Sequence, residues 1–225
     1  MIRRVAIALA IAGATVSTSA SAQFANRLQA IAGGESASTQ QASAGAPDEA
    51  KQEALVNTFV ASQAQIMDAQ LSFARAFKLA GAIQSLEAER VSLASGAVNL
   101  DDMQKAKTLS ESVQAELDAR MAAQPELDAE SKQHYAAGVA SLFKSLVEGR
   151  KLVGEAGNFT SGLQSLNAMQ MASAARKLRA GAWVAKESPG YVRRLYDSSR
   201  QAVTFGRQSR VEIPANADSL LSSFD

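Results

Sequence analysis

The sequence predicts an all-α protein: an antiparallel bundle of four to five helices, with a short tethered N-terminal helix and an irregular C-terminal tail. The chain is rich in alanine and holds only four prolines and 5% aromatic residues, a composition that favours helix over strand. Apolar residues recur at three- and four-residue intervals, and no stretch alternates in the manner of a half-buried strand. Short loops between the expected helices indicate an antiparallel bundle.

The first 22 residues have the organisation of a secretory signal peptide. Arg3 and Arg4 precede an uncharged apolar run, and small residues then lead to an A-x-A site that ends at Ala22. A membrane anchor is the alternative, but a spanning helix needs roughly 20 predominantly apolar residues, and this run is shorter. We therefore expect cleavage after Ala22 and a periplasmic protein.

Charge and cysteine content narrow the function classes. Loss of the signal peptide would leave 21 basic against 22 acidic residues, which argues against a general binder of polyanions, so nucleic acid is not an expected partner. The chain contains no cysteine. Packing alone must therefore hold an exported fold, and thiol catalysis, thiolate metal sites and covalently attached haem are excluded.

Residues 23–47 are predicted to form a short amphipathic segment followed by a flexible linker. Phe24, Leu28 and Ile31 fall on one face of a helix. Residues 33–47 are small, polar and aperiodic, as in linkers. The three apolar side chains are therefore a candidate docking segment, which would bind either the body of its own chain or a partner.

A helical-bundle domain is expected over residues 48–210. Its first helix starts with Asp48 and Glu49, whose charges suit a helix N-terminus, and it ends near Ser95, with Gly81 as a candidate interruption. Apolar residues seven apart form a seam that would pack against another helix or against a second copy of the chain, giving a homo-oligomer: Phe59, Ile66 and Phe73.

The next two helices are bounded by clear signals. Asn99 is the expected N-cap of the second helix, which ends before Pro125 because a residue that precedes proline is pushed away from helical geometry. The third helix is expected to start at about Glu126 and to break at Gly157 and Asn158.

The last part of the bundle is predicted as two further helices. The fourth begins near Thr160 and is rich in small residues, with Met169 on its inner face. Ser188 is the expected N-cap of the fifth, with Pro189 at its first position. Residues 211–225 are predicted to be an irregular tail, with one last turn near its end.

Candidate metal and cofactor ligands are sparse. Glu130 and His134 are four apart and could share a helix face towards a metal. Met169 and Met171 suit copper, but residues two apart on a helix diverge. Met67 with His134 could hold a b-type haem inside a bundle. Core or surface positions explain each of these residues more simply, so we predict no metal and no cofactor.

No catalytic constellation is recognisable. The chain lacks a G-x-S-x-G nucleophile elbow, and a single histidine is present to act as a base. Gly33 and Gly34 belong to a linker and follow no strand, so they do not form a phosphate loop. We therefore expect a protein that is not an enzyme.

Residues 176–210 are strongly basic, with nine basic against two acidic side chains. Such a stretch either attracts an anionic partner or pairs with the acidic helices of its own bundle. Trp183, Tyr191 and Tyr196 lie in the same stretch and are interpreted as core residues rather than as stacking platforms for bases. The candidate patch for an anionic partner consists of Arg176, Lys177, Arg179, Arg193, Arg194, Arg200, Arg207 and Arg210.

Two hypotheses for function follow. In the first, the protein is a non-catalytic interaction or adaptor protein of the cell envelope, whose partner is an envelope protein or an anionic envelope surface. In the second, the bundle encloses a cavity that binds a small ligand, a lipid, a metal or haem. That cavity would be lined by Met67, Phe73, Phe77, Met169 and His134.

Overall fold

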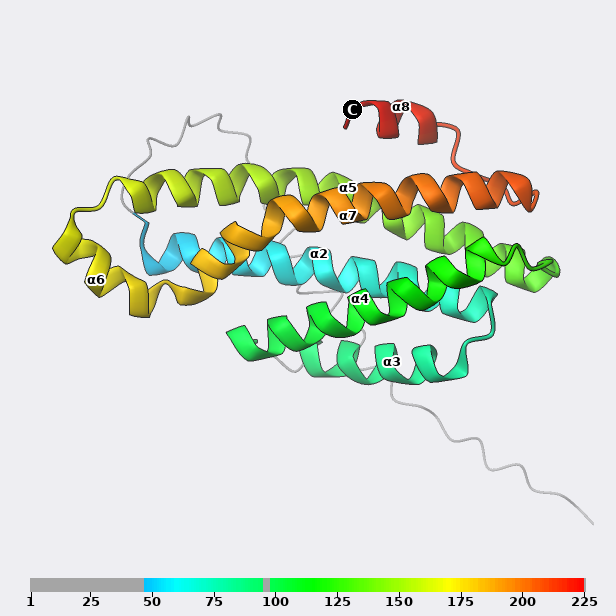
Figure 1. The fold of residues 1–225 in the computed structure, drawn as a ribbon, viewed down its shortest axis with the longest axis horizontal. Coiled ribbons are helices and arrows are strands. Elements are labelled where there is room, and N and C mark those ends of the chain that lie inside the picture. The colour runs from blue at the N-terminus through cyan, green and yellow to red at the C-terminus, as the bar shows by residue number, and fades with distance from the viewer. Residues whose placement is uncertain (1–46, 95–97, 225) are drawn as a thin grey trace, which may run out of the picture. The chain divides into compact units, whose positions relative to one another are not determined.

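A computed structural model describes residues 47–94 and 98–224 of the chain (Figure 1). These residues form α2 (Glu49–Ala76), α3 (Ala80–Ala94), α4 (Leu100–Ala122), α5 (Ala129–Gln164), α6 (Ala168–Lys177), α7 (Arg179–Gln208) and α8 (Ala217–Ser222), and no strand occurs among them. The all-α prediction is confirmed. The signal peptide and the segment with Phe24, Leu28 and Ile31 lie outside the described residues.

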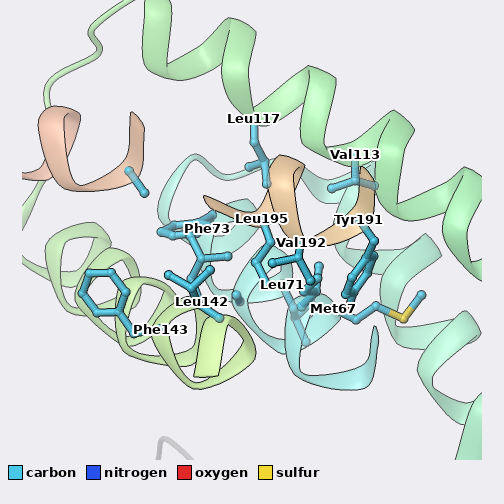
Figure 2. Close-up of a cluster of buried hydrophobic side chains, with 14 of the residues drawn as sticks. Met67, Leu71, Phe73, Val113, Leu117, Leu142, Phe143, Tyr191, Val192 and Leu195 are labelled. Carbon is cyan, nitrogen blue, oxygen red and sulfur yellow. The ribbon is translucent and has the colours of Figure 1, made fainter. Parts of the chain in front are cut away.

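Helix α2 is the central element of the bundle. It packs against α3, α4, α5 and α7, most extensively against α5. Figure 1 shows α2, α3, α4 and α5 running alternately in opposite directions, with α7 antiparallel to α5. Figure 2 shows side chains from α2, α4, α5 and α7 meeting in one hydrophobic cluster, including Met67, Leu117, Leu142 and Leu195.

The seam on α2 is buried inside the chain. Phe59 contacts the rings of Trp183 and Tyr191 on α7, each at a centroid distance of 5.4 Å. Phe73 contacts the ring of Tyr135 on α5 at 4.8 Å. Together with the buried Ile66, these residues join α2 to its neighbours, so the seam leaves no surface for a second copy.

The packing of the Phe73 ring of α2 onto the backbone of α5 depends on a glycine. A Cβ atom built on Gly138 would lie 2.6 Å from the ring of Phe73, which is closer than side chains tolerate. One turn earlier, the buried Tyr135 hydroxyl donates a hydrogen bond to the Ala202 carbonyl of α7 at 2.9 Å. This part of α5 therefore ties α2 and α7 together.

The first predicted helix is two helices, and the break is not at Gly81. Lys78 has a φ of 58° in the left-handed region, which ends α2 and directs Leu79 into the core. Its ammonium contacts Asp128 at 2.8 Å, and this hydrogen bond holds the pKa of the Asp128 carboxyl well below its usual range. Apolar periodicity continues on both sides of Lys78, which hides the break in the sequence.

Two helix boundaries predicted in the second half of the chain are wrong, both because buried residues lie beyond the predicted break. Helix α5 continues through Gly157 and Asn158, because Phe159 beyond them is buried in the core. Pro189 lies inside α7 rather than at its first position. Proline removes one helical hydrogen bond, but buried residues on both sides, such as Val184 and Tyr191, keep both halves of α7 packed.

Helix α4 has the predicted boundaries. Asn99 and Asp102 form a capping box in which each side chain accepts a hydrogen bond from the other's backbone N–H, at 3.1 Å and 3.0 Å. The helix ends at Ala122, before Pro125. Helix α5 begins slightly later than predicted, with Asp128 as its N-cap, and the tail predicted to be irregular contains α8.

Candidate functional site

A row of basic side chains runs along the outer face of α7. Five of them are spaced by seven residues, and all five are exposed: Arg179, Lys186, Arg193, Arg200 and Arg207. Seven residues make about two helical turns, so these side chains lie on one side of the helix, roughly 10 Å apart, over about 42 Å. We call these five residues the basic row.

The opposite face of α7 fixes the direction of the row. Val184, Tyr191, Leu195, Ala202 and Phe205 are all buried, because α7 packs against α5, α2 and α4. An amphipathic helix that buries one stripe must turn the opposite stripe to solvent. The row is therefore held in place by the same packing that forms the core.

Acidic partners for the row are few among the residues that the structure describes. Of its five members, Arg207 forms an ion pair there, with both carboxylate oxygens of Asp218 at 2.8 Å. The Arg200 guanidinium lies 5.7 Å from the ring centroid of Tyr196. Within residues 47–94 and 98–224, Arg179, Lys186 and Arg193 form no ion pair.

The patch predicted from the sequence divides into two sets. Lys177 lies 3.6 Å from Glu49 of α2, and Arg194 lies 3.0 Å from Glu111 of α4, so these two residues and Arg207 pair with acidic side chains of the chain itself. The exposed members without such an ion pair in the described part of the chain are Arg176, Arg179, Arg193, Arg200 and Arg210.

Lys186 belongs to the row but not to the predicted patch. Its position halfway between Arg179 and Arg193 completes the seven-residue spacing. The sequence contains this spacing, and charged residues that repeat every seven positions lie on one helix face just as apolar residues do. A count of net charge over residues 176–210 does not show which of the basic residues share a face.

The candidate metal and cofactor ligands do not come together. His134 Nε2 lies 3.9 Å from Glu130 Oε1 at the partly exposed surface of α5. Among the described residues, no three His, Cys, Asp or Glu side chains are grouped as metal ligands. Met67 is buried in the core, whereas Met169 is 85% exposed. The predicted core position of Met169 is therefore wrong, and it cannot line a cavity with Met67.

A small cleft lies between α2, α4 and α7, and polar side chains that line it form hydrogen bonds with neighbouring residues. The Gln70 amide donates to the Ser110 carbonyl at 2.8 Å and accepts from the Ser110 hydroxyl at 3.0 Å. The Tyr191 hydroxyl shares a hydrogen bond of 2.9 Å with Ser62, and burial raises the pKa of Tyr191. The cavity measures about 60 Å³, against the 300 Å³ or more of typical ligand sites.

None of the helices in residues 47–94 and 98–224 combines the length and the apolar character that are needed to cross a membrane.

Comparison with known proteins identifies no relative of this chain. No protein-family model matches it. Neither a curated protein nor a solved structure shows significant similarity to it.

Proposed function

We propose that this protein is an exported, non-catalytic interaction or adaptor protein of the cell envelope, and that the basic row binds a negatively charged surface there. The observation that carries the proposal is the linear arrangement of exposed cations from Arg179 to Arg207. Only Arg207 of the row forms an ion pair within the described residues. The sequence pattern of the first 22 residues supports export.

The length of the row favours an extended partner over a small ligand. Neighbouring members are roughly 10 Å apart, and the screening length at physiological salt is about 8 Å. Each cation therefore acts on the charges directly opposite it rather than on a distant point. A partner that neutralises the whole row must carry negative charge over about 40 Å.

The ion pairs around the row would compete weakly with such a partner. Arg194 and Glu111 are both substantially exposed, as are Arg207 and Asp218. Exposed pairs of this kind contribute about 1 kcal/mol or less. A partner with a higher density of negative charge would therefore recruit these arginines in addition to the unpaired members of the row.

A charge reversal with a matched control tests the proposal. The row variant carries Lys186→Glu, Arg193→Glu and Arg200→Glu, and the control carries Arg120→Glu, Lys132→Glu and Lys144→Glu, with the same change in net charge. Each is purified as a chain that begins at Gln23 and is mixed with envelope fractions at low and high salt. Sedimentation measures retention, and circular dichroism verifies folding.

Wild type and control should be retained at low salt and released at high salt, since contacts between exposed charges are screened. The row variant should bind more than about a hundredfold more weakly, because each basic residue near an anionic surface contributes about 1 kcal/mol and reversal adds repulsion. Equal retention of a folded row variant would contradict the proposal.

Export has its own measurement. Protein recovered from the periplasm should begin at Gln23, because the small residues before it form the cleavage site. N-terminal sequencing distinguishes the two outcomes directly. A recovered chain that begins at Met1 would contradict cleavage, even if the basic row proved to bind an anionic surface.

A further inference from the structure

Helix α6 turns most of its apolar residues towards solvent. The groove that it shares with the start of α2 is lined on this side by Gln170, Ser173, Ala174 and Lys177. At 100° per residue, the opposite side of α6 carries alanines, with Met169 and Met171 at its two edges. We call this side the apolar face of α6; its residues are all exposed and are Ala168, Met169, Met171, Ala172 and Ala175.

An ordinary surface helix buries its apolar stripe, whereas α6 exposes both of its sides and packs only Ala174 partly against the core. Met169 is 85% exposed and Met171 is 39% exposed. None of the residues of α6 is buried. The start of the helix is held by a capping box, in which Asn167 and Gln170 each accept a hydrogen bond from the other's backbone, at 2.9 Å and 3.0 Å. Its end is held by the Lys177 carbonyl, which accepts a hydrogen bond of 3.1 Å from the Gln52 side chain of α2.

Basic residues adjoin the apolar face. Arg176 follows Met169 by seven residues and so lies on the same side of α6. Arg179 opens α7 two residues after α6 ends, and the basic row begins there. Figure 1 shows α6 at the end of the bundle, between the end of α5 and the start of α7. Apolar and cationic side chains thus lie together at the end of the bundle that α6 forms.

We propose that α6 inserts shallowly into the surface of a bilayer that contains anionic lipids. Met169 and Met171 would enter the boundary between headgroups and acyl chains, while Arg176 and Arg179 contact the phosphates. This inference rests on the proposed function and deepens it, because it identifies the anionic surface as lipid. The basic row would then extend the contact away from the inserted corner.

The small area of the apolar face of α6 and the residue types on it favour lipid over a protein partner. A ten-residue helix is about 15 Å long, whereas stable protein interfaces bury about 1,200 Å² or more. Such interfaces depend on aromatic or arginine anchors in fitted pockets. The face of α6 holds small alanines and two flexible methionines, which need no complementary shape in a fluid acyl boundary.

Vesicle sedimentation of the chain that begins at Gln23 tests the proposal. The vesicles are phosphatidylcholine alone or phosphatidylcholine mixed with phosphatidylglycerol in equal parts. The α6 variant carries Met169→Gln and Met171→Gln, and the rescue variant carries leucine at both positions. A matched control replaces exposed valines on other helices, Val91→Gln and Val147→Gln.

A fluorescent label reports insertion itself. The chain contains no cysteine, so Ala172→Cys provides one labelling site on the apolar face, and Gln104→Cys provides one on the exposed surface of α4. An environment-sensitive dye at residue 172 should shift to shorter wavelength with phosphatidylglycerol vesicles. The dye at residue 104 should not shift, because that side of α4 is outside the proposed contact.

Support for the proposal is binding to phosphatidylglycerol vesicles that falls roughly tenfold in the α6 variant and persists in the rescue and valine variants. Unchanged binding by the α6 variant, or no dye shift at residue 172, overturns insertion. If wild type binds no vesicles while the row variant still loses retention on envelope fractions, lipid is wrong and the proposed function stands. If that row variant is also retained, both proposals fail.

Discussion

Helices α6 and α8 are the two shortest in the described part of the chain, and different interactions hold them. Helix α6 begins with a capping box at Asn167 and buries none of its residues. Helix α8 has no side-chain cap at Asn216, but it buries Ala217 and packs Leu220 and Leu221 against the core. A local capping box therefore holds the start of α6, and its last residue, Lys177, is bonded to α2, through Gln52 and Glu49. Apolar contacts with distant residues hold α8.

The polar contacts of α8 follow the same pattern. Asp218 accepts two hydrogen bonds from Arg207 of α7. Arg150 of α5 donates to the Ser223 carbonyl at 2.6 Å, and its guanidinium lies 4.2 Å from the ring centroid of Phe224. The apolar residues of α8 are thus partly covered by the bundle. The apolar face of α6, in contrast, is exposed.

The largest expected effect is on the free energy of unfolding, and it should differ between α8 and α6. Leu220→Ser combined with Leu221→Ser should lower the free energy of unfolding by about 2 kcal/mol, because two half-buried leucines lose their apolar contacts. The matched pair Met169→Ser and Met171→Ser should change it by less than about 0.5 kcal/mol, since these side chains are exposed. Urea unfolding followed by circular dichroism measures both, and equal losses would contradict the comparison.

This difference could not be predicted from the sequence, because periodicity identifies a face without saying which way it points. Met169 recurs with other apolar residues, and the pattern placed it inside the bundle, but it is 85% exposed. The fold class and the Asn99 cap were predictable, since both depend on composition or on local hydrogen bonds. The boundaries predicted at Pro189 and Gly81 were wrong, because Pro189 lies inside a packed α7 and the break between α2 and α3 falls at Lys78.

The candidate site was predictable in part. Its location within residues 176–210 follows from charge alone. Which cations are already paired depends on distant residues, because Glu49, Glu111 and Asp218 reach Lys177, Arg194 and Arg207 only in the folded chain. The seven-residue spacing that includes Lys186 was available in the sequence, and counting charge without position missed it.

Removal of the cap should affect α6 without affecting the rest of the bundle. Asn167→Ala should destabilise α6 by about 1 kcal/mol, because the Gln170 backbone N–H loses its acceptor. Hydrogen exchange followed by mass spectrometry should show faster exchange in residues 168–177 only, since α6 has no buried residue to couple it to the core. Asn216→Ala is the control and should change hydrogen exchange little. Neither variant should alter the unfolding of the whole protein, and faster exchange throughout the bundle in Asn167→Ala would contradict the prediction.

Replacement of the last aromatic residue should weaken the attachment of α8. The Phe224 ring stacks on Tyr196 with a centroid distance of 6.1 Å and also receives the Arg150 guanidinium. Phe224→Leu keeps an apolar side chain but removes both ring interactions, so we expect a loss of about 1 kcal/mol. Thermal unfolding measures it, and a variant as stable as wild type would show that the ring contacts contribute nothing.

The smallest effect on stability should carry the most information about binding. Asp218→Asn removes the ion pair with Arg207, and because both side chains are exposed the cost should be below about 1 kcal/mol and should shrink further at high salt. The same change frees Arg207 and adds an unpaired cation to the basic row. One more cation near an anionic surface contributes about 1 kcal/mol, so retention on envelope fractions at low salt should increase roughly fivefold while stability falls slightly. A folded variant whose retention decreases would show that Arg207 contributes to α8 and not to the row.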